Sequence, residues 1–414
     1  MARVLLINAG AEGHINPTLG VVQELIGRHE EVVYVATEQF RDRIERIGAK
    51  VITYDADKFL KTFLAGGRNP WARAGGLLRT ADVVIPSVLK QTKGERFDYI
   101  IHDSMFGCGY LLAQILGLPA VNSCASFAMQ KNSFDNRQDR RSLQFPADVN
   151  ELAQQEFQQS VRQVQEKYNV QIGSAYEVFC NPAPLTIVYT SKHFQPGGES
   201  FDESYKFVGP SVVPRSNDEF DWSHVDTDNL IYISLGTVFN QVVDFYKLCF
   251  EAFANTKYTV MLTVGRQTRI AELGDIPENF MVRNYMPQLE VLQHARLFIT
   301  HGGMNSTSEG LYYGVPLIVL PQSADQPIIA RRVAEVGAGI QLNHEGLTAG
   351  NFIETAERVL KDASFRKSCE EIGNSFRASG GYHRAVEEIF AYKRSLGIEG
   401  WTGSRSKDSS ITHL

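Results

Sequence analysis

Short apolar runs alternate along the chain with longer stretches whose apolar residues recur at helical spacing. In the first half we expect strands at Val4–Asn8, Val32–Ala36, Val51–Tyr54, Tyr99–His102, Ala120–Asn122 and Thr186–Tyr189. Amphipathic segments such as Leu19–Ile26 and Tyr110–Leu116 lie between them. Because near-continuous apolar strands alternate with helices, the pattern predicts a parallel sheet covered on both faces.

The same alternation restarts in the second half. We expect strands at Leu230–Ser234, Tyr258–Val264, Phe280–Asn284, Leu297–Thr300 and Val315–Leu320. Helices are expected around Val242–Ala254, Asn305–Tyr313, Asp325–Val336, Asn351–Leu360, Phe365–Arg377 and His383–Arg394. Between the halves, Gln195 to Asp228 is rich in Gly, Pro and Asp without periodicity, which is typical of a linker.

The fold class that follows is α/β, with two tandem doubly wound, Rossmann-like domains. We place the first domain at 1–210, a linker at 211–228 and the second domain at 229–380. The tail at 397–414 is polar and is expected to fray. A length of 414 residues fits two domains of about 200 residues each.

Composition narrows the function classes. A 43% hydrophobic content excludes a largely disordered chain. The net charge of −6, without a basic stripe, argues against a nucleic-acid partner. No apolar run approaches 18 residues, the N-terminus does not resemble a signal peptide, and the five scattered cysteines suit reduced thiols. We therefore expect a cytoplasmic protein without a membrane anchor.

Open α/β sheets bind ligands at the carboxyl ends of their strands. After Val4–Asn8 comes a glycine-containing turn with His14, followed by Asn16 and Pro17, which suit an N-cap and a first helical residue. This predicts His14 just ahead of a helix whose positive end keeps the imidazole neutral near pH 7. The alternative is a histidine on a surface loop.

A second strand ends in His102-Asp103 at the same expected edge. Asp103 could accept a hydrogen bond from one ring nitrogen of His14, which would orient the ring and offset its charge. Side-chain alternation favours Asp103 over His102 for this place. The alternative is that Asp103 caps a helix beginning near Met105.

Two other chemistries fit less well. The spacing Gly10-x-x-Gly13 departs from the dinucleotide fingerprint, so Glu38 is more simply a solvated loop residue than a ribose-binding acid. Asp55-Ala56-Asp57 resembles a metal-binding Asp-x-Asp, but it follows a first-domain strand and fits a solvated turn. We expect neither a metal nor another cofactor.

In the second domain, four strand ends carry ligand-binding residue types. His301, Gly303, Asn305 and Ser306 begin a helix, where free N–H groups attract phosphate. Glu309, one turn on, suits the vicinal hydroxyls of a ribose. The remaining candidates are Asp325 and Gln326 for sugar hydroxyls, Ser234, Gly236 and Thr237 for phosphate, and Tyr285, Met286 and Gln288 for a base. Helix capping alone explains any one of these.

Together these motifs resemble the UDP-sugar-dependent glycosyltransferases, above all those of the bacterial macrolide type. The likeness covers almost the whole chain, including Phe207-Val208-Gly209-Pro210 at the domain boundary. It implies a GT-B fold, with the acceptor on the first domain, the nucleotide sugar on the second, and a last helix at 381–396 that returns to the first domain. Many relatives carry Trp in place of Tyr285, which implies weaker base stacking here.

The resemblance also implies roles for residues. His14 would be the general base and Asp103 its partner. His301, Asn305 and Ser306, with Ser234 and Thr237, would hold the diphosphate, and Glu309 the ribose. Tyr285 with the Met286 backbone would hold the uracil, and Asp325 with Gln326 the sugar.

We therefore expect an inverting transferase, acting as a monomer, that moves a hexose from a UDP-sugar to a hydrophobic small molecule such as a phenol, a flavonoid or a macrolide. Glucose is the first choice of sugar. Segments Phe59–Leu78 and Phe127–Phe145 are expected either as lids over the acceptor or as ordinary core. A UDP-sugar 2-epimerase and a non-catalytic nucleotide-sugar binder remain as alternatives, whereas a phosphorylase would need a cofactor lysine and a longer chain.

Overall fold

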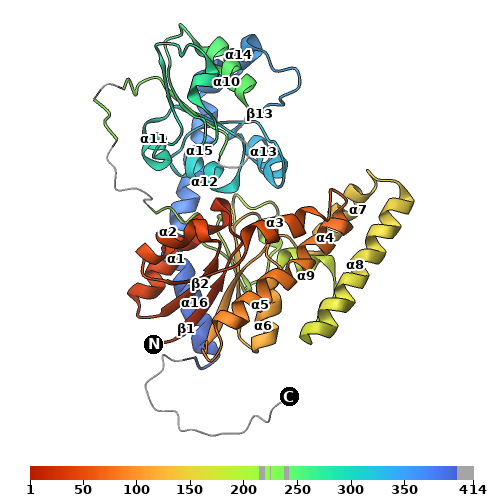
Figure 1. The fold of residues 1–414 in the computed structure, drawn as a ribbon. Coiled ribbons are helices and arrows are strands. Elements are labelled where there is room, and N and C mark those ends of the chain that lie inside the picture. The colour runs from red at the N-terminus through yellow and green to blue at the C-terminus, as the bar shows by residue number, and fades with distance from the viewer. Residues whose placement is uncertain (214–219, 224, 237–241, 399–414) are drawn as a thin grey trace.

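The computed structural model describes residues 1–213, 220–223, 225–236 and 242–398, which form two α/β domains stacked one above the other (Figure 1). In the first domain seven parallel strands have the order β3-β2-β1-β4-β5-β6-β7. Their bounds are β1 Arg3–Ile7, β2 Glu31–Ala36, β3 Lys50–Thr53, β4 Tyr99–Asp103, β5 Ala120–Cys124, β6 Leu185–Val188 and β7 Tyr205–Phe207. In the second domain six parallel strands have the order β10-β9-β8-β11-β12-β13. These are β8 Leu230–Ser234, β9 Thr259–Thr263, β10 Phe280–Arg283, β11 Leu297–Thr300, β12 Leu317–Val319 and β13 Gly339–Gln341.

Helices cover both faces of each sheet. Those of the first domain are α1 Glu12–Gly27, α2 Arg41–Arg46, α3 Ala56–Leu64, α4 Pro70–Arg79, α5 Ala81–Gln91, α6 Cys108–Leu116, α7 Lys131–Ser142, α8 Ala147–Tyr168 and α9 Ala175–Cys180. The later helices are α10 Val243–Phe253, α11 Gln288–His294, α12 Met304–Tyr312, α13 Gln326–Glu335, α14 Ala349–Lys361, α15 Ala363–Ala378 and α16 Gly381–Ser395. The predicted fold class is confirmed.

Strand β1 shows why both faces need covering. Leu5 and Ile7 belong to one apolar cluster of the first domain, whereas Val4 and Leu6 belong to the cluster on the opposite face. Successive side chains of a strand point to opposite faces of the sheet. A strand that is apolar at every position therefore needs helices packed on both faces. The continuous apolar runs in the sequence therefore correspond to central strands.

The linker predicted from Gln195 is wrong in its first part. Residues Tyr205–Phe207 form β7, which pairs with β6 at the edge of the first sheet. Strand β13 was likewise not expected. Three residues at a sheet edge carry too short an apolar pattern to be recognised, and the Gly and Pro residues around β7 masked it further.

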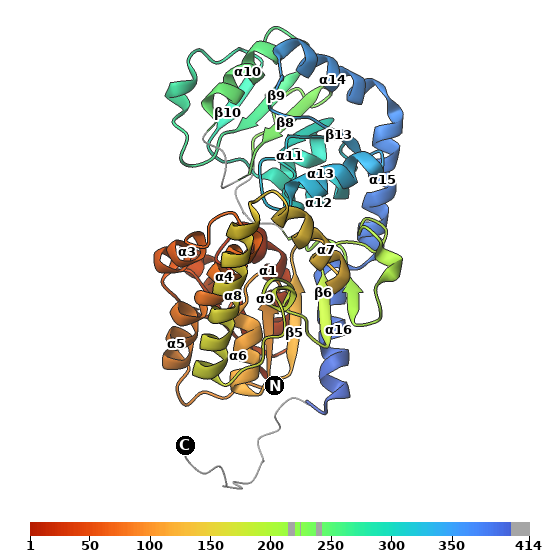
Figure 2. The same ribbon diagram turned by 90° about the vertical axis from the view of Figure 1, so that its right-hand side faces the viewer.

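The last helix returns to the first domain, as the resemblance implied. In Figure 2, α15 descends from the second domain into α16, which runs along the first. Ala385, Val386 and Ile389 of α16 complete an apolar cluster of the first domain. At its far end the Lys393 ammonium forms a buried ion pair with Glu30. The chain thus crosses between the domains twice.

Candidate active site

His14 lies inside the first turn of α1. The helix begins at Glu12 with Ala11 as its N-cap residue, so the expected start at Asn16 and Pro17 is wrong. The Asn16 side chain accepts a hydrogen bond from the Arg43 guanidinium instead of capping the helix. Pro17, inside the helix, has no N–H to offer the carbonyl of Gly13 four residues earlier.

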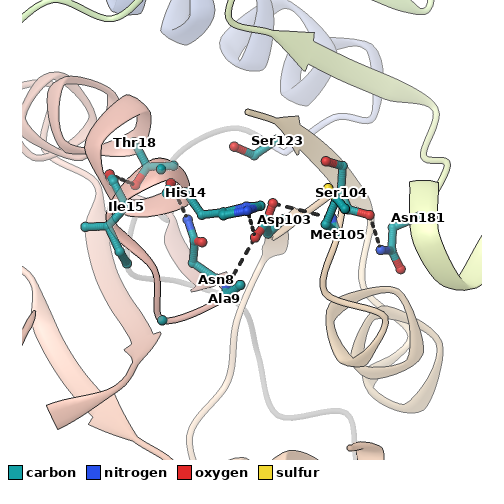
Figure 3. A network of polar contacts seen from close by, with 12 residues as sticks. Asn8, Ala9, His14, Ile15, Thr18, Asp103, Ser104, Met105, Ser123 and Asn181 are labelled. Atoms are coloured by element: carbon teal, nitrogen blue, oxygen red, sulfur yellow. Dashed lines mark hydrogen bonds and ion pairs between the residues drawn. The ribbon is translucent and has the colours of Figure 1, made fainter. Parts of the chain in front are cut away.

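Asp103, the last residue of β4, lies beside His14 as predicted (Figure 3). His14 Nδ1 is 2.7 Å from Asp103 Oδ2, and the Asp103 side chain is only 1% exposed. The same oxygen accepts from the backbone N–H of Ala9 at 3.2 Å, which ties the carboxylate to the loop before α1. His102 is fully buried, and α6 does not begin until Cys108, so Asp103 is not its cap.

The pKa of His14 is raised above its ordinary value. Burial lowers it, but the charge of Asp103, the hydrogen bond to Asp103 and the more distant charge of Asp325 together raise it by more. The shift of the pKa is therefore opposite in direction to the one expected from the helix N-terminus, and a neutral ring near pH 7 stays a prediction. Asp103 makes His14 a stronger base than a free imidazole.

The backbone around His14 is fixed by a polar residue that the sequence analysis missed. Asn8 Nδ2 donates to the carbonyl of His14 at 2.9 Å and contacts the Tyr34 hydroxyl at 3.2 Å. Tyr34 OH in turn lies 2.6 Å from Thr18 Oγ1. Asn8 follows β1, so the signal was a polar residue at a strand end, as for Asp103.

In the second domain, two glycines make room for His301. A Cβ on Gly236 would lie 2.5 Å from His301 Cε1, and one on Gly303 would lie 2.5 Å from His301 Nε2. Gly236 also has a φ of +77°, which favours glycine. Burial lowers the pKa of His301 to about 4, so the ring is neutral at pH 7 and can donate one N–H without carrying a charge.

Helix α12 presents an uncapped N-terminus beside His301. Its N-cap residue is Gly303, which makes no side-chain cap. The free N–H groups of the first turn, which contains Asn305 and Ser306, are the groups that bind phosphate. Ser234 ends the neighbouring strand β8, hydrogen-bonded to β11, and is buried. Thr237 lies outside the described residues.

Glu309 lies further along α12. Its Oε2 accepts a hydrogen bond at 2.6 Å from Nε2 of Gln288, the first residue of α11, and the same Nε2 lies 3.4 Å from Ser306 Oγ. This brings the expected ribose-binding acid and the expected base-binding segment together. Tyr285 is 54% exposed, whereas Met286 is buried. An exposed ring beside a buried backbone suits the stacking of a base.

Asp325 reaches across to the first domain. Its Oδ2 accepts a hydrogen bond from Ser126 Oγ at 2.5 Å. Gln326 Oε1 accepts from the N–H groups of Gln322 and Ser323, so this amide oxygen stabilises its own loop. Ser126 was missed, although it follows β5 and so lies at a strand end.

The two segments expected as lids or core form helices α3, α4 and α7. Phe59, Phe63, Trp71 and Phe134 are partly buried and pack against the first-domain core, which favours the core interpretation. Phe59 contacts Tyr54 with ring centroids 5.4 Å apart. The Tyr54 hydroxyl accepts from the N–H of Gly10 at 2.9 Å, so this aromatic group reaches the loop before His14.

Asp55 and Glu38, which the sequence analysis considered less suited to metal or ribose binding, interact with neighbouring residues. Asp55 accepts from the N–H of Lys58 as the N-cap of α3, and Glu38 is exposed and paired with Arg41. Within the residues that the structure describes, no cluster of His, Cys, Asp or Glu could hold a metal ion. In the same part of the chain no helix is both long and apolar enough to cross a bilayer.

Comparison with known proteins supports the resemblance. Residues 248–387 match the family model described as the C-terminal domain of erythromycin biosynthesis protein CIII-like proteins. An uncharacterized UDP-glucosyltransferase of Bacillus subtilis, YojK, is 35% identical and covers 94% of this chain and 97% of its own. Oleandomycin glycosyltransferase of Streptomyces antibioticus is 28% identical, over 94% of this chain and 90% of its own.

Among solved structures, the calicheamicin glycosyltransferase CalG4 superposes with a TM-score of 0.82 at 29% identity, covering 96% of this chain and 99% of its own. The likeness therefore extends over both domains, and it includes sequence as well as fold. The chain belongs to the UDP-glycosyltransferases of the bacterial macrolide type, with the GT-B fold.

Proposed function

We propose that the enzyme transfers a hexose, with glucose as the first choice, from a UDP-sugar to a hydroxyl group of a hydrophobic small molecule, with inversion at the anomeric carbon. The observation that carries this proposal is the His14–Asp103 pair, 2.7 Å apart, on the domain face opposite α12 and Asp325. A purely nucleotide-binding protein has no use for such a pair. The names of the relatives support a glucosyl donor and a macrolide-like acceptor.

In the proposed step His14 acts as general base. With Nδ1 directed at Asp103, Nε2 accepts the proton of the acceptor hydroxyl. The acceptor oxygen bonds to the anomeric carbon as the bond from that carbon to the diphosphate oxygen breaks, and UDP leaves. Asp103 stabilises the imidazolium that forms.

Negative charge develops on the leaving diphosphate. In this proposal the α12 N-terminus, the neutral N–H of His301 and the Ser234 hydroxyl stabilise that charge. We assign Glu309 to the ribose, Tyr285 and Met286 to the uracil, and Asp325 with Gln326 to the sugar hydroxyls. No step in this scheme requires a metal, so activity should persist in EDTA.

The test is a matrix of donors and acceptors read by mass. UDP-glucose, UDP-galactose and dTDP-glucose are each combined with phenols, flavonoids and macrolides. A mass increase of one hexose with UDP-glucose supports the proposal, and an α-linked product detected by NMR would contradict inversion. Release of UDP without acceptor, accompanied by a 2-epimeric sugar, would favour the epimerase. Binding of UDP-glucose without any product would indicate a non-catalytic binder.

A cytoplasmic monomer, expected from the sequence, stays a prediction.

A further inference from the structure

Helix α7 and the start of α4 carry a group of arginines without acidic partners. Arg137 and Arg141 are one turn apart on α7, and Arg68 and Arg73 flank the start of α4. Among the described residues none of the four forms an ion pair within 4.0 Å, whereas Arg41 on α2 and Lys167 on α8 each contact a carboxylate. Four arginines without an ion pair in one place call for an explanation.

A polar link holds the two segments together. Asn69, next to Arg68, donates through Nδ2 to Asn150 Oδ1 at 2.7 Å. Asn150 Nδ2 in turn donates to the carbonyl of Ser142, next to Arg141, at 2.8 Å. Two hydrogen bonds therefore place Arg68 and Arg141 at one corner of the first domain.

Electrostatic effects agree with this placement. Burial, followed by the positive charges of Arg141 and Arg68, lowers the pKa of Arg73. Burial and the charge of Arg141 likewise lower the pKa of Arg137. The like charges are therefore close enough to repel one another, and a bound anion would relieve that repulsion.

The acids of α7 do not neutralise this group. Asp135 is paired with Lys131 at 2.7 Å, and Asp139 forms no ion pair among the described residues. Gln138, on the same helix, is only 6% exposed. Its side-chain amide nitrogen is buried and has no acceptor among the described residues. A buried N–H without a partner is costly, so an acceptor atom from a bound molecule would stabilise it.

The group borders the site described above. Helix α7 lies at the top of the first domain, beneath α12 and α13 of the second (Figures 1 and 2). Arg137 is half-buried and lies near enough to Asp325 for the two charges to interact. Aromatic side chains are adjacent, since the partly buried Phe134 on α7 contacts the partly buried Phe179 and the buried Tyr176.

We propose that the acceptor carries an anionic group, a carboxylate, sulfate or phosphate, that Arg137 and Arg141 bind with help from Arg73, while its apolar body lies against the aromatic side chains. This rests on the proposed function and deepens it by naming the acceptor class. Guanidinium groups suit oxyanions because two parallel N–H groups match two oxygens. Arg137 and Arg141 thus determine which acceptor is preferred and take no part in the chemical step.

An anionic membrane surface is the competing ligand. Leu64 and Leu143 are exposed near the same corner, at 55% and 83%. Arg73 argues against this reading because it is half-buried, donates to the carbonyl of Gly67 and covers the Phe63 ring at 5.3 Å. A lipid headgroup would be bound by exposed arginines, whereas Arg73 and Arg137 are half-buried and only Arg68 and Arg141 are exposed.

The experiment compares 7-hydroxycoumarin-3-carboxylic acid with its ethyl ester as acceptors, using UDP-glucose. Loss of fluorescence reports transfer to the 7-hydroxyl in both. We expect Arg137→Met and Arg141→Met each to lower kcat/KM for the acid about tenfold, and to change that for the ester less than twofold. Arg162→Met, which removes an exposed arginine from α8 outside the group, should leave both unchanged.

An acid-to-ester ratio unchanged in both variants would overturn the inference. So would variants that lose sedimentation with phosphatidylglycerol vesicles while the ratio stays the same, since the group would then bind lipid. If the wild-type protein transfers glucose to neither coumarin, nor to any acceptor of the donor matrix, the proposed function itself fails. Transfer to the ester alone leaves that function intact and contradicts only the anionic acceptor.

Discussion

The side-chain amide of Asn305 donates to the backbone carbonyl of Gly13 at 3.1 Å, which joins the first turn of α12 in the second domain to the first turn of α1 in the other. Gly13 can accept this bond because Pro17, four residues later, has no N–H to occupy its carbonyl. The contact joins the helix end that carries His14 to the helix end that we propose as the phosphate site. It also links two features, a proline and an asparagine, that looked unrelated in the sequence.

We expect Asn305→Ala to raise the KM for UDP-glucose about fivefold, because a bond of this kind contributes about 1 kcal/mol and the same amide lies beside the proposed phosphate site. The melting temperature should fall by about 2 °C or less. Steady-state kinetics and thermal unfolding check both. An unchanged KM would show that α12 binds donor without help from Asn305.

His14→Ala should reduce transfer to alcohols by about 10²- to 10⁴-fold, the usual contribution of a general base. Binding of UDP-glucose, measured by calorimetry, should remain within about twofold, because the proposed donor site lies on the other domain. Turnover that survives the substitution would remove His14 from the chemical step.

Asp103→Asn should shift the pH profile as well as lower kcat. The Asp103 charge raises the pKa of His14, so its loss lowers that pKa, and the rise of activity with pH should move to lower pH. A profile whose midpoint stays in place would mean that another group titrates. Asp139→Asn, an exposed substitution on α7, is the control.

The free energy of unfolding should fall as the pH drops from 7 towards 4. Burial lowers the pKa of both His102 and His301 to about 4, against about 6.5 in the unfolded chain. Between these values the unfolded state binds more protons, so stability is lost on acidification, by about 2 kcal/mol for each ring at pH 5. His14, with its raised pKa, acts in the opposite direction and offsets part of the loss.

Urea unfolding at pH 7 and pH 5 measures this loss. His102→Leu should weaken the dependence of the free energy of unfolding on pH, and it leaves the proposed donor site unchanged. Equal slopes for the variant and the wild type would contradict the assignment.

Gly236→Ala should destabilise the second domain by about 1–3 kcal/mol and weaken donor binding, because the new methyl group meets the His301 ring and the backbone has a positive φ. Gly274→Ala separates the two causes. Gly274 has a φ of +81°, but nothing lies within 4 Å of a Cβ placed there. This control should cost some stability yet leave the KM for UDP-glucose unchanged.

Lys393→Met should destabilise the protein by about 3–5 kcal/mol by leaving the Glu30 carboxylate buried without its partner. The double variant Lys393→Met with Glu30→Met should recover much of that loss, since no charge then remains. Urea unfolding of the four proteins in the cycle measures the coupling. Additive effects would show that the pair contributes nothing to holding α16 on the first domain.

The sequence by itself determined the class of fold and the positions in the chain of the candidate site residues. Strands such as Leu297–Thr300 were found at their observed positions because a run of buried apolar residues needs no distant information. Asp103 was preferred over His102 correctly, because alternation along a strand is a local rule. The strand ends pointed to ligand sites because parallel sheets gather those ends at one edge.

Only the tertiary structure decided which of these residues contact one another. The start of α1 was misplaced because Arg43, 27 residues from Asn16, takes the side chain that would have been the cap. The raised pKa of His14 depends on charges 89 and 311 residues away, those of Asp103 and Asp325. Ser126 and Gly13 became partners of the second domain only when the chain folded. Electrostatic and hydrogen-bond energies depend on distance in space, and local sequence patterns carry no information about which remote groups come within reach.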